Sequence, residues 1–145
     1  MLARNAKRTP TILVVDDSPE MLRYLRSLLE VECYQVETAG SGREALQRLN
    51  EGCNPDVVLL DIQMPELDGL STLKRLLKLR PGLKVVMCSG ISDPRKIRQA
   101  TVLGAQAYLT KPVQQLYLTA ALERCLDAPQ QSSMQAMPFP ATRLQ

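Results

Sequence analysis

The chain has 145 residues, 45% of them hydrophobic and 23% charged, and its formal net charge is +3. These values are typical of a single globular domain with its own core, and so small a basic excess argues against a surface dedicated to nucleic acid. The chain contains no histidine, which excludes histidine general bases, catalytic triads and histidine-ligated metals.

The two ends of the chain differ in composition from the part between them. Residues 1–9 are basic, and residues 129–145 are rich in Pro, Gln and Ser. We expect a solvated N-terminal tail, one folded domain over residues 10–128, and a linker or loose tail after it. No apolar run reaches the roughly 18 residues that a membrane-spanning helix needs, so we expect no membrane segment and no membrane partner.

The cysteines have spacings that suit neither a zinc site nor a disulfide framework. No two of them form a C-x-x-C pair; they are Cys33, Cys53, Cys88 and Cys125. Reduced thiols in a cytoplasmic protein are the better interpretation.

Five short apolar runs alternate with longer segments of helical period. Three of the runs are nearly continuous Val, Leu and Ile, which is typical of strands buried on both faces of a parallel sheet. The second run alternates in polarity, so we expect it towards an edge of the sheet. In chain order the runs are TILVV (11–15), YQVET (34–38), DVVLL (56–60), LKVVMC (83–88) and AQAYLT (105–110).

Between the runs, apolar residues recur three and four positions apart, as on one face of a helix. The first such segment begins at Ser18 and Pro19, a capping residue followed by a proline suited to the first helical position. A later segment repeats the pattern with Asp93 and Pro94 and stops at Gly104. Strand and helix alternate five times. This predicts an α/β fold: a doubly wound, five-stranded parallel sheet in the order 2-1-3-4-5, with right-handed crossovers and helices on both faces.

Polar side chains follow four of the runs at the point where the strand ends. Asp16 and Asp17 follow the first run, Asp61 the third, Ser89 the fourth and Lys111 the fifth. Because ligands bind outside the carboxyl ends of strands in such a sheet, we expect these groups at one edge. Three carboxylates gather only where a cation neutralises them, and an all-oxygen ligand set suits Mg²⁺. With a lysine and a hydroxyl nearby, the pattern predicts a site for a phosphoryl group and a carboxylate nucleophile.

Each of these residues, taken alone, also has an ordinary structural interpretation. Asp16 and Asp17 could serve only the dipole of the following helix, and Asp61 could be a loop acid before a turn. Lys111 could be a solvated surface lysine, and Tyr108 could be a strand residue that packs on its neighbour. Their convergence on one sheet edge favours a joint site.

These residues and the motifs around them closely resemble the receiver domain of two-component response regulators. The resemblance runs from about Thr11 to Asp127 and rests on ILVVDDSPEMLRYL, PDVVLLDIQMPELDGL, KVVMCSG and LGAQAYLTKPV, in the order and spacing of that family. It implies a flavodoxin-like receiver fold and a signalling switch based on an aspartyl phosphate, rather than an enzyme with a substrate.

The resemblance implies a role for each acidic residue. Asp61 would be the phosphoacceptor, and Mg²⁺ would bind the carboxylates of Asp17 and Asp61 and the main-chain carbonyl of Gln63. Asp16 would hold the metal shell through water.

The same resemblance implies a switch around the phosphoryl group. Ser89 would bond the phosphoryl group, and Tyr108 would turn from solvent into the space that Ser89 vacates. Lys111 matches the lysine of the family's site, and the Lys111–Pro112 peptide bond would be cis.

The partners follow from the resemblance and from the missing histidine. The phosphoryl donor must be another molecule, so we expect a phosphohistidine on a sensor histidine kinase or a histidine phosphotransfer protein. An output domain could follow the chain, and a homodimer could form through the 93–126 face. We expect no direct nucleic-acid binding by this domain and a place in the cytoplasm.

Two other classes of function stay open from the residues alone. A haloacid-dehalogenase-like phosphatase would use the aspartate after a strand as its nucleophile, but its second acid falls at Gln63, which cannot transfer a proton. A phosphorylation-independent scaffold is the other class, and the complete acidic site argues against it.

Overall fold

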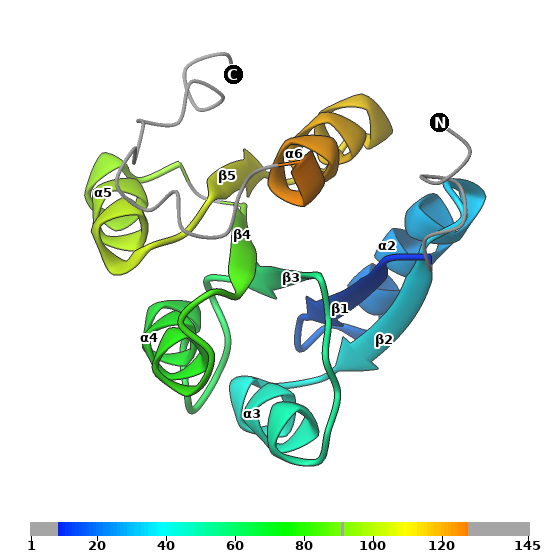
Figure 1. Cartoon of the computed structure of the whole chain (residues 1–145). Helices are drawn as coiled ribbons and strands as arrows, with labels where there is room; N and C mark the ends of the chain where they lie inside the picture. The colour runs from blue at the N-terminus through cyan, green and yellow to red at the C-terminus, as the bar shows by residue number, and fades with distance from the viewer. Residues whose placement is uncertain (1–8, 91, 128–145) are drawn as a thin grey trace.

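The structure is a computed structural model that describes residues 9–90 and 92–127. Both expected tails therefore lie almost wholly outside the described residues. Five strands form one parallel sheet in the order β2-β1-β3-β4-β5, which confirms the predicted topology (Figure 1). The strands are β1 (Thr11–Val15), β2 (Gln35–Ala39), β3 (Val57–Asp61), β4 (Lys84–Ser89) and β5 (Ala107–Thr110).

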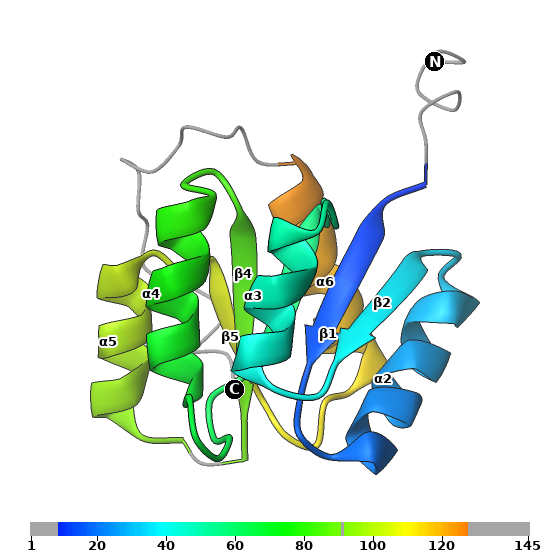
Figure 2. The same cartoon turned by 90° about the horizontal axis from the view of Figure 1, so that it is seen from below.

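The helices cover both faces of the sheet. They are α2 (Pro19–Val31), α3 (Gly42–Asn50), α4 (Gly69–Leu79), α5 (Pro94–Leu103) and α6 (Gln115–Asp127). Helices α3, α4 and α5 lie on one face, and α2 and α6 lie on the other (Figure 2). None of the described helices is long and apolar enough to cross a membrane.

The sheet sends alternate side chains into two separate cores. On β1, Leu13 and Val15 pack beneath α3 and α4, whereas Ile12 and Val14 pack against α2 and α6. This is the physical reason for the continuous apolar runs, because both faces of a central strand are buried. The alternating strand β2 is at an edge of the sheet, as its sequence predicts.

Three of the strands lie one residue later than the apolar runs suggest. Strands β2, β3 and β4 cover 35–39, 57–61 and 84–89, where we expect 34–38, 56–60 and 83–88. As a consequence, Asp61 and Ser89 are the last residues of their strands rather than the first residues of the following loops.

Side-chain caps fix where the helices begin. Ser18 accepts a hydrogen bond from the Met21 amide at 3.2 Å, and Asp93 accepts one from the Arg95 amide at 2.9 Å, which confirms both predicted caps. Asp68 caps α4 in the same way.

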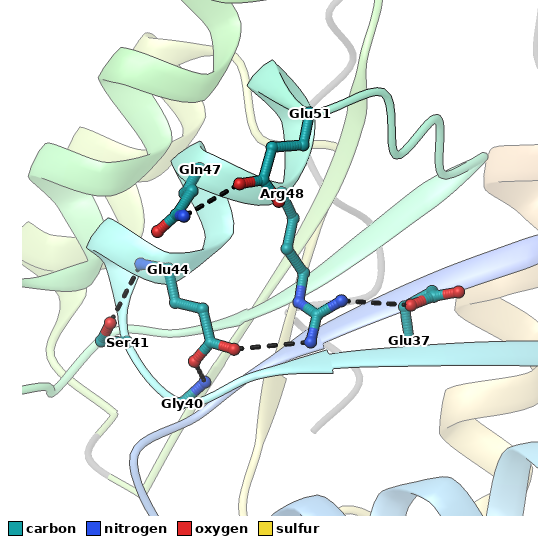
Figure 3. Close-up of polar contacts among 7 residues, drawn as sticks. All are labelled: Glu37, Gly40, Ser41, Glu44, Gln47, Arg48 and Glu51. Carbon is teal, nitrogen blue, oxygen red and sulfur yellow. Dashed lines mark hydrogen bonds and ion pairs between the residues drawn. The ribbon is translucent and has the colours of Figure 1, made fainter.

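Ion pairs and hydrogen bonds tie α3 to the end of β2 (Figure 3). The Arg48 guanidinium contacts Glu37 Oε1 at 3.3 Å and Glu44 Oε2 at 3.4 Å. The other carboxylate oxygen of Glu44 accepts from the Gly40 amide at 2.7 Å. Arg48 is therefore compensated by two acids on its own face of the molecule.

All four cysteines are free, as the spacing predicts. Burial raises the pKa of the Cys88 thiol to about 12 and that of the Cys125 thiol to about 11. Both thiols are therefore neutral and pack as small apolar side chains.

The first turn of α4 lies against the end of β3. A Cβ atom added at Gly69 would come to 2.2 Å from the Asp61 carbonyl oxygen and 2.5 Å from Ile62 Cα. The Gly69 amide also donates to the Ile62 carbonyl at 2.9 Å. Only glycine allows the helix to begin so close to the strand end that carries Asp61.

We predict that Gly69→Ala destabilises the protein by about 1–3 kcal/mol, because the added methyl group meets backbone atoms that cannot move aside without distorting β3. Chemical denaturation would measure the change. Gly90→Ala is the control, since a Cβ there meets nothing within 4 Å. Equal stability of Gly69→Ala and the control would contradict the close approach.

Candidate functional site

Three carboxylates meet at the carboxyl edge of the sheet. Asp16 and Asp17 follow β1, Asp61 ends β3, and these two strands are neighbours. One carboxylate oxygen of each lies within 4.8 Å of those of the other two. Asp16 and Asp61 are 2% and 4% exposed, whereas Asp17 is exposed. The structure thus brings together the acids that the strand ends predict.

Backbone amides orient the two buried carboxylates. The Ser18 amide donates to Asp16 Oδ1 at 2.9 Å, so the turn into α2 holds this side chain. The Asp16 amide donates to the Ala39 carbonyl at 3.1 Å, which ties the end of β1 to β2. The Gln63 amide donates to Asp61 Oδ1 at 3.3 Å. Both carboxylates are therefore held by the loops that follow their strands.

Lys111 brings the positive charge to this edge. Its ammonium Nζ lies 2.9 Å from Asp16 Oδ2 and 3.3 Å from Asp61 Oδ1. Lys111 follows β5, so its side chain extends past the end of β4 to reach β3 and β1. The Lys111–Pro112 peptide bond is cis in the structure.

The charges at the site shift each other's pKa. Burial, and then the negative charge of Asp16, raise the pKa of Asp61, against the opposing effect of Lys111. Burial on its own would lower the pKa of Lys111, but the contacts with Asp16 and Asp61 outweigh it and raise the pKa. The lysine therefore stays charged, and one ammonium group faces two buried carboxylates.

Ser89 and Tyr108 lie beside this acidic cluster and contact each other. Ser89 ends β4 and is 1% exposed, and Tyr108 on β5 is 3% exposed. The two side chains share a hydrogen bond, while burial raises the pKa of the Tyr108 hydroxyl. The Tyr108 side chain is turned inward in this structure, and its expected turn from solvent on phosphorylation stays a prediction.

The chemistry of the donor set fits a hard divalent cation. Carboxylate oxygens are the ligands that Mg²⁺ prefers, and exposed Asp17 opens the cluster to water. No histidine or thiolate competes for the ion, since the chain has no histidine and the nearby Cys88 is buried and neutral. The cluster is therefore suited to binding a metal ion.

Two residues support the site without appearing among its predicted members. Asp68 Oδ1 accepts from the Ser71 amide at 2.8 Å and starts α4, and Gly69 then lets α4 approach Asp61. The signal was present in the sequence as an Asp-Gly pair directly before an apolar helical segment. The sequence does not indicate that this helix start contacts the site, because the contact joins Gly69 to a strand end eight positions earlier.

Comparisons with known proteins agree with this geometry. Residues 12–123 match the family described as the response regulator receiver domain. The chain is 32% identical to the chemotaxis protein CheY of Thermotoga maritima, over 78% of this chain and 94% of that protein. It is 39% identical to the transcriptional regulatory protein ZraR of Escherichia coli, over 79% of this chain but 26% of that protein. A crystal structure of a CheY-like receiver domain protein from Methanospirillum hungatei matches with a TM-score of 0.78 and 33% identity, covering 83% of this chain and 95% of that one.

We predict that Asp61→Asn raises the stability of the protein when no divalent cation is present. The raised pKa of Asp61 means that its ionised form costs folding free energy. This cost is absent at pH values below the pKa of Asp61 in the unfolded chain. It grows as the pH rises and is complete above the raised pKa of Asp61 in the folded protein. In EDTA, the variant should therefore melt above the wild type at about pH 7, and the difference should shrink towards about pH 4.

Asp68→Asn is the matched control for this experiment. Asp68 is exposed, and asparagine caps a helix as well as aspartate does, so its melting temperature should stay close to that of the wild type. A melting temperature of Asp61→Asn below that of the wild type at neutral pH would contradict this account of the charges.

Proposed function

The chain belongs to the response regulator receiver domain family, and from this premise we propose that Asp61 is the residue that accepts the phosphoryl group. The family consists of signalling switches rather than enzymes, which sets aside a phosphatase and fits phosphorylation-dependent switching. One observation carries the choice of Asp61. It is the buried carboxylate that closes β3 at the centre of the acidic cluster, with Lys111 3.3 Å away.

We propose Mg²⁺ as the cation of this cluster. Asp17 and Asp61 would bind it through their carboxylates and Gln63 through its main-chain carbonyl, while Asp16 would act through water. When bound, the ion neutralises the carboxylates and draws electron density from the phosphoryl oxygens. Exposed Asp17 gives it a route from solvent, whereas Asp16 is already committed to Lys111 and to the Ser18 amide.

In the proposed transfer, a carboxylate oxygen of Asp61 attacks the phosphorus atom of a phosphohistidine on a partner protein. The new P–O bond forms as the P–N bond breaks, and the histidine ring keeps the electron pair of that bond and takes up a proton. Lys111 balances the negative charge on the equatorial oxygens, and the Ser89 hydroxyl donates to one of them. The hydrogen bond of the Gln63 amide to Asp61 Oδ1 leaves the other carboxylate oxygen as the nucleophile.

We propose that Ser89 and Tyr108 convert the phosphoryl group into a change of surface. A new acceptor at Asp61 competes with the Tyr108 hydroxyl for the hydrogen bond of Ser89. If Ser89 turns towards the phosphoryl group, the inward position of Tyr108 has to be held by packing alone. The equilibrium between the positions of Tyr108 then depends on phosphorylation.

The wider setting follows from the family and from the composition of the chain. We propose a receiver domain over residues 10–128, with a basic tail before it and a linker or tail at 129–145. The same proposal includes a kinase or phosphotransfer partner, a downstream output domain, a homodimer through the 93–126 face and a place in the cytoplasm. The match to 26% of ZraR supports an arrangement in which such a domain controls a longer regulator.

The direct test is chemical phosphorylation. With Mg²⁺ and acetyl phosphate, the wild type should gain one phosphoryl group that hydroxylamine removes, and Asp61→Asn should gain none. Mass spectrometry of the intact protein would count the groups, and Asp68→Asn should be labelled like the wild type. Equal labelling of Asp61→Asn and the wild type would refute the assignment.

A second test separates the metal from the acceptor. Asp17→Asn removes an exposed ligand and should weaken Mg²⁺ binding by at least tenfold, measured as the Mg²⁺ concentration that gives half of the rise in melting temperature. Glu20→Gln is the control, because Glu20 carries the same charge three residues later in the first turn of α2. Unchanged Mg²⁺ dependence in Asp17→Asn would place the ion elsewhere.

A further inference from the structure

Basic side chains are concentrated on the surface formed by α4 and α5. These helices lie side by side on one face of the sheet (Figures 1 and 2). Neither helix contains an acidic residue. We call five of their exposed basic side chains the α4–α5 basic face; they are Lys74, Lys78, Arg95, Lys96 and Arg98, whereas exposed Arg75 lies on the side of α4 towards α3.

Helix geometry turns four of these side chains towards solvent, two on each helix. Leu77 on α4 faces α5, because a Cβ added at Gly104, which caps α5, would lie 3.0 Å from Leu77 Cδ1. Lys74 is three residues before Leu77 and Lys78 directly follows it, so both lie on or near the α5 side of α4. On α5, Ala100 is the buried position, which turns Arg95 and Arg98 outward.

No acid among the described residues compensates this charge. In residues 9–90 and 92–127, none of the five side chains makes a hydrogen bond or an ion pair. Arg48 on neighbouring α3 shows the contrast, since it pairs with Glu37 and Glu44 (Figure 3). The basic face is therefore available to an acidic group from outside.

The placement of the charges also opposes helix stability. Arg95 and Lys96 lie in the first turn of α5, where the helix dipole disfavours positive charge. Lys74 and Lys78 are four residues apart on α4, and like charges at that spacing repel each other. Lys78 alone is in a favourable place, in the last turn of α4. Apart from Lys78, the basic side chains of this face therefore gain nothing from the helix dipole.

The basic face is directly connected to the two strand ends of the acidic site. Helix α4 follows β3, which ends in Asp61, and α5 follows β4, which ends in Ser89. Gly69 holds the start of α4 against the Asp61 carbonyl. A shift at the end of β3 would therefore displace the start of α4.

We propose that the α4–α5 basic face docks an acidic amphipathic segment of a partner protein. Val102 on α5 is 80% exposed and lies four residues after Arg98, so an apolar side chain sits among the charges. A phosphate backbone has no apolar group to cover Val102, whereas a segment with acidic and apolar residues covers both the charges and this side chain. The docking stands by itself; only its control by phosphorylation rests on the proposed role of Asp61.

The test uses the whole chain and a fluorescein-labelled helical peptide composed of Glu, Leu and Ala, with binding followed by fluorescence anisotropy. The peptide should bind the wild type, and added salt should weaken the binding. Poly-Glu of the same length should bind at least fivefold more weakly, because it lacks apolar side chains. Duplex DNA of 20 base pairs serves as the competing polyanion.

Charge reversal locates the site. The variants Lys74→Glu/Lys78→Glu and Arg95→Glu/Arg98→Glu should each weaken peptide binding at least tenfold. The control Arg23→Glu/Arg124→Glu changes the net charge equally on α2 and α6, the opposite face of the sheet, and should bind like the wild type. Lys74→Gln/Lys78→Gln, which only removes the two charges, should lie between the wild type and the reversed variant, and thermal melts would show that each variant folds.

Three outcomes would overturn the proposal. The first is that the peptide does not bind the wild type. The second is that Arg23→Glu/Arg124→Glu weakens peptide binding as much as the α4 and α5 variants do, which would mean that only the net charge matters. The third is tighter binding of the DNA, lost in the same variants, which would make the face a nucleic-acid surface. Docking is measured on the wild type without a phosphodonor, and labelling of Asp61 is measured by mass spectrometry, so a failure of labelling and a failure of docking are separate results.

Discussion

Compensation of buried negative charge is the constraint on which the site depends. Asp16 and Asp61 are almost fully buried, and the Lys111 ammonium lies within 3.3 Å of both. Two carboxylates in that position repel each other unless a cation faces them. The ion pairs therefore fix how the chain after β5 meets the ends of β1 and β3, and they leave Asp17 as the acid that faces water.

The sheet makes this arrangement possible because it is buried on both faces. Residues of β1 and β3 alternate between two cores, so a shift of one residue would exchange the side chains of the two sides. The strand ends are thereby fixed, and Asp61 and Ser89 close neighbouring strands. Helix α4 is placed by this strand end, since it begins in contact with the Asp61 carbonyl.

The two charged regions of the molecule differ in how their charge is balanced. At the sheet edge, two buried acids face one lysine within the chain, and the third acid faces water. On α4 and α5, the basic side chains have no partner among the described residues and oppose the helix dipole in part. This surface without charge partners consists of the helices that follow β3 and β4.

The sequence by itself determined the fold class, the strand order and the set of residues at the sheet edge. It could do so because continuous apolar runs mark central strands, and parallel strands bring their carboxyl ends to one side. It also placed the caps at Ser18 and Asp93, which are local hydrogen bonds within a few residues. Strand bounds were displaced by one residue, since hydrophobicity marks burial and not the end of the hydrogen-bond ladder.

Only the tertiary structure decided which of these residues touch. The inward position of Tyr108 depends on Ser89 of the neighbouring strand, and the start of α4 depends on the space that Gly69 leaves beside Asp61. Lys84 looks in the sequence like a solvent-exposed charge, yet it is 9% exposed and its Nζ donates to the Cys125 carbonyl at 2.7 Å. Each of these contacts joins elements far apart in the chain or on different strands, and local sequence patterns carry no information about which distant atom will fill a given space.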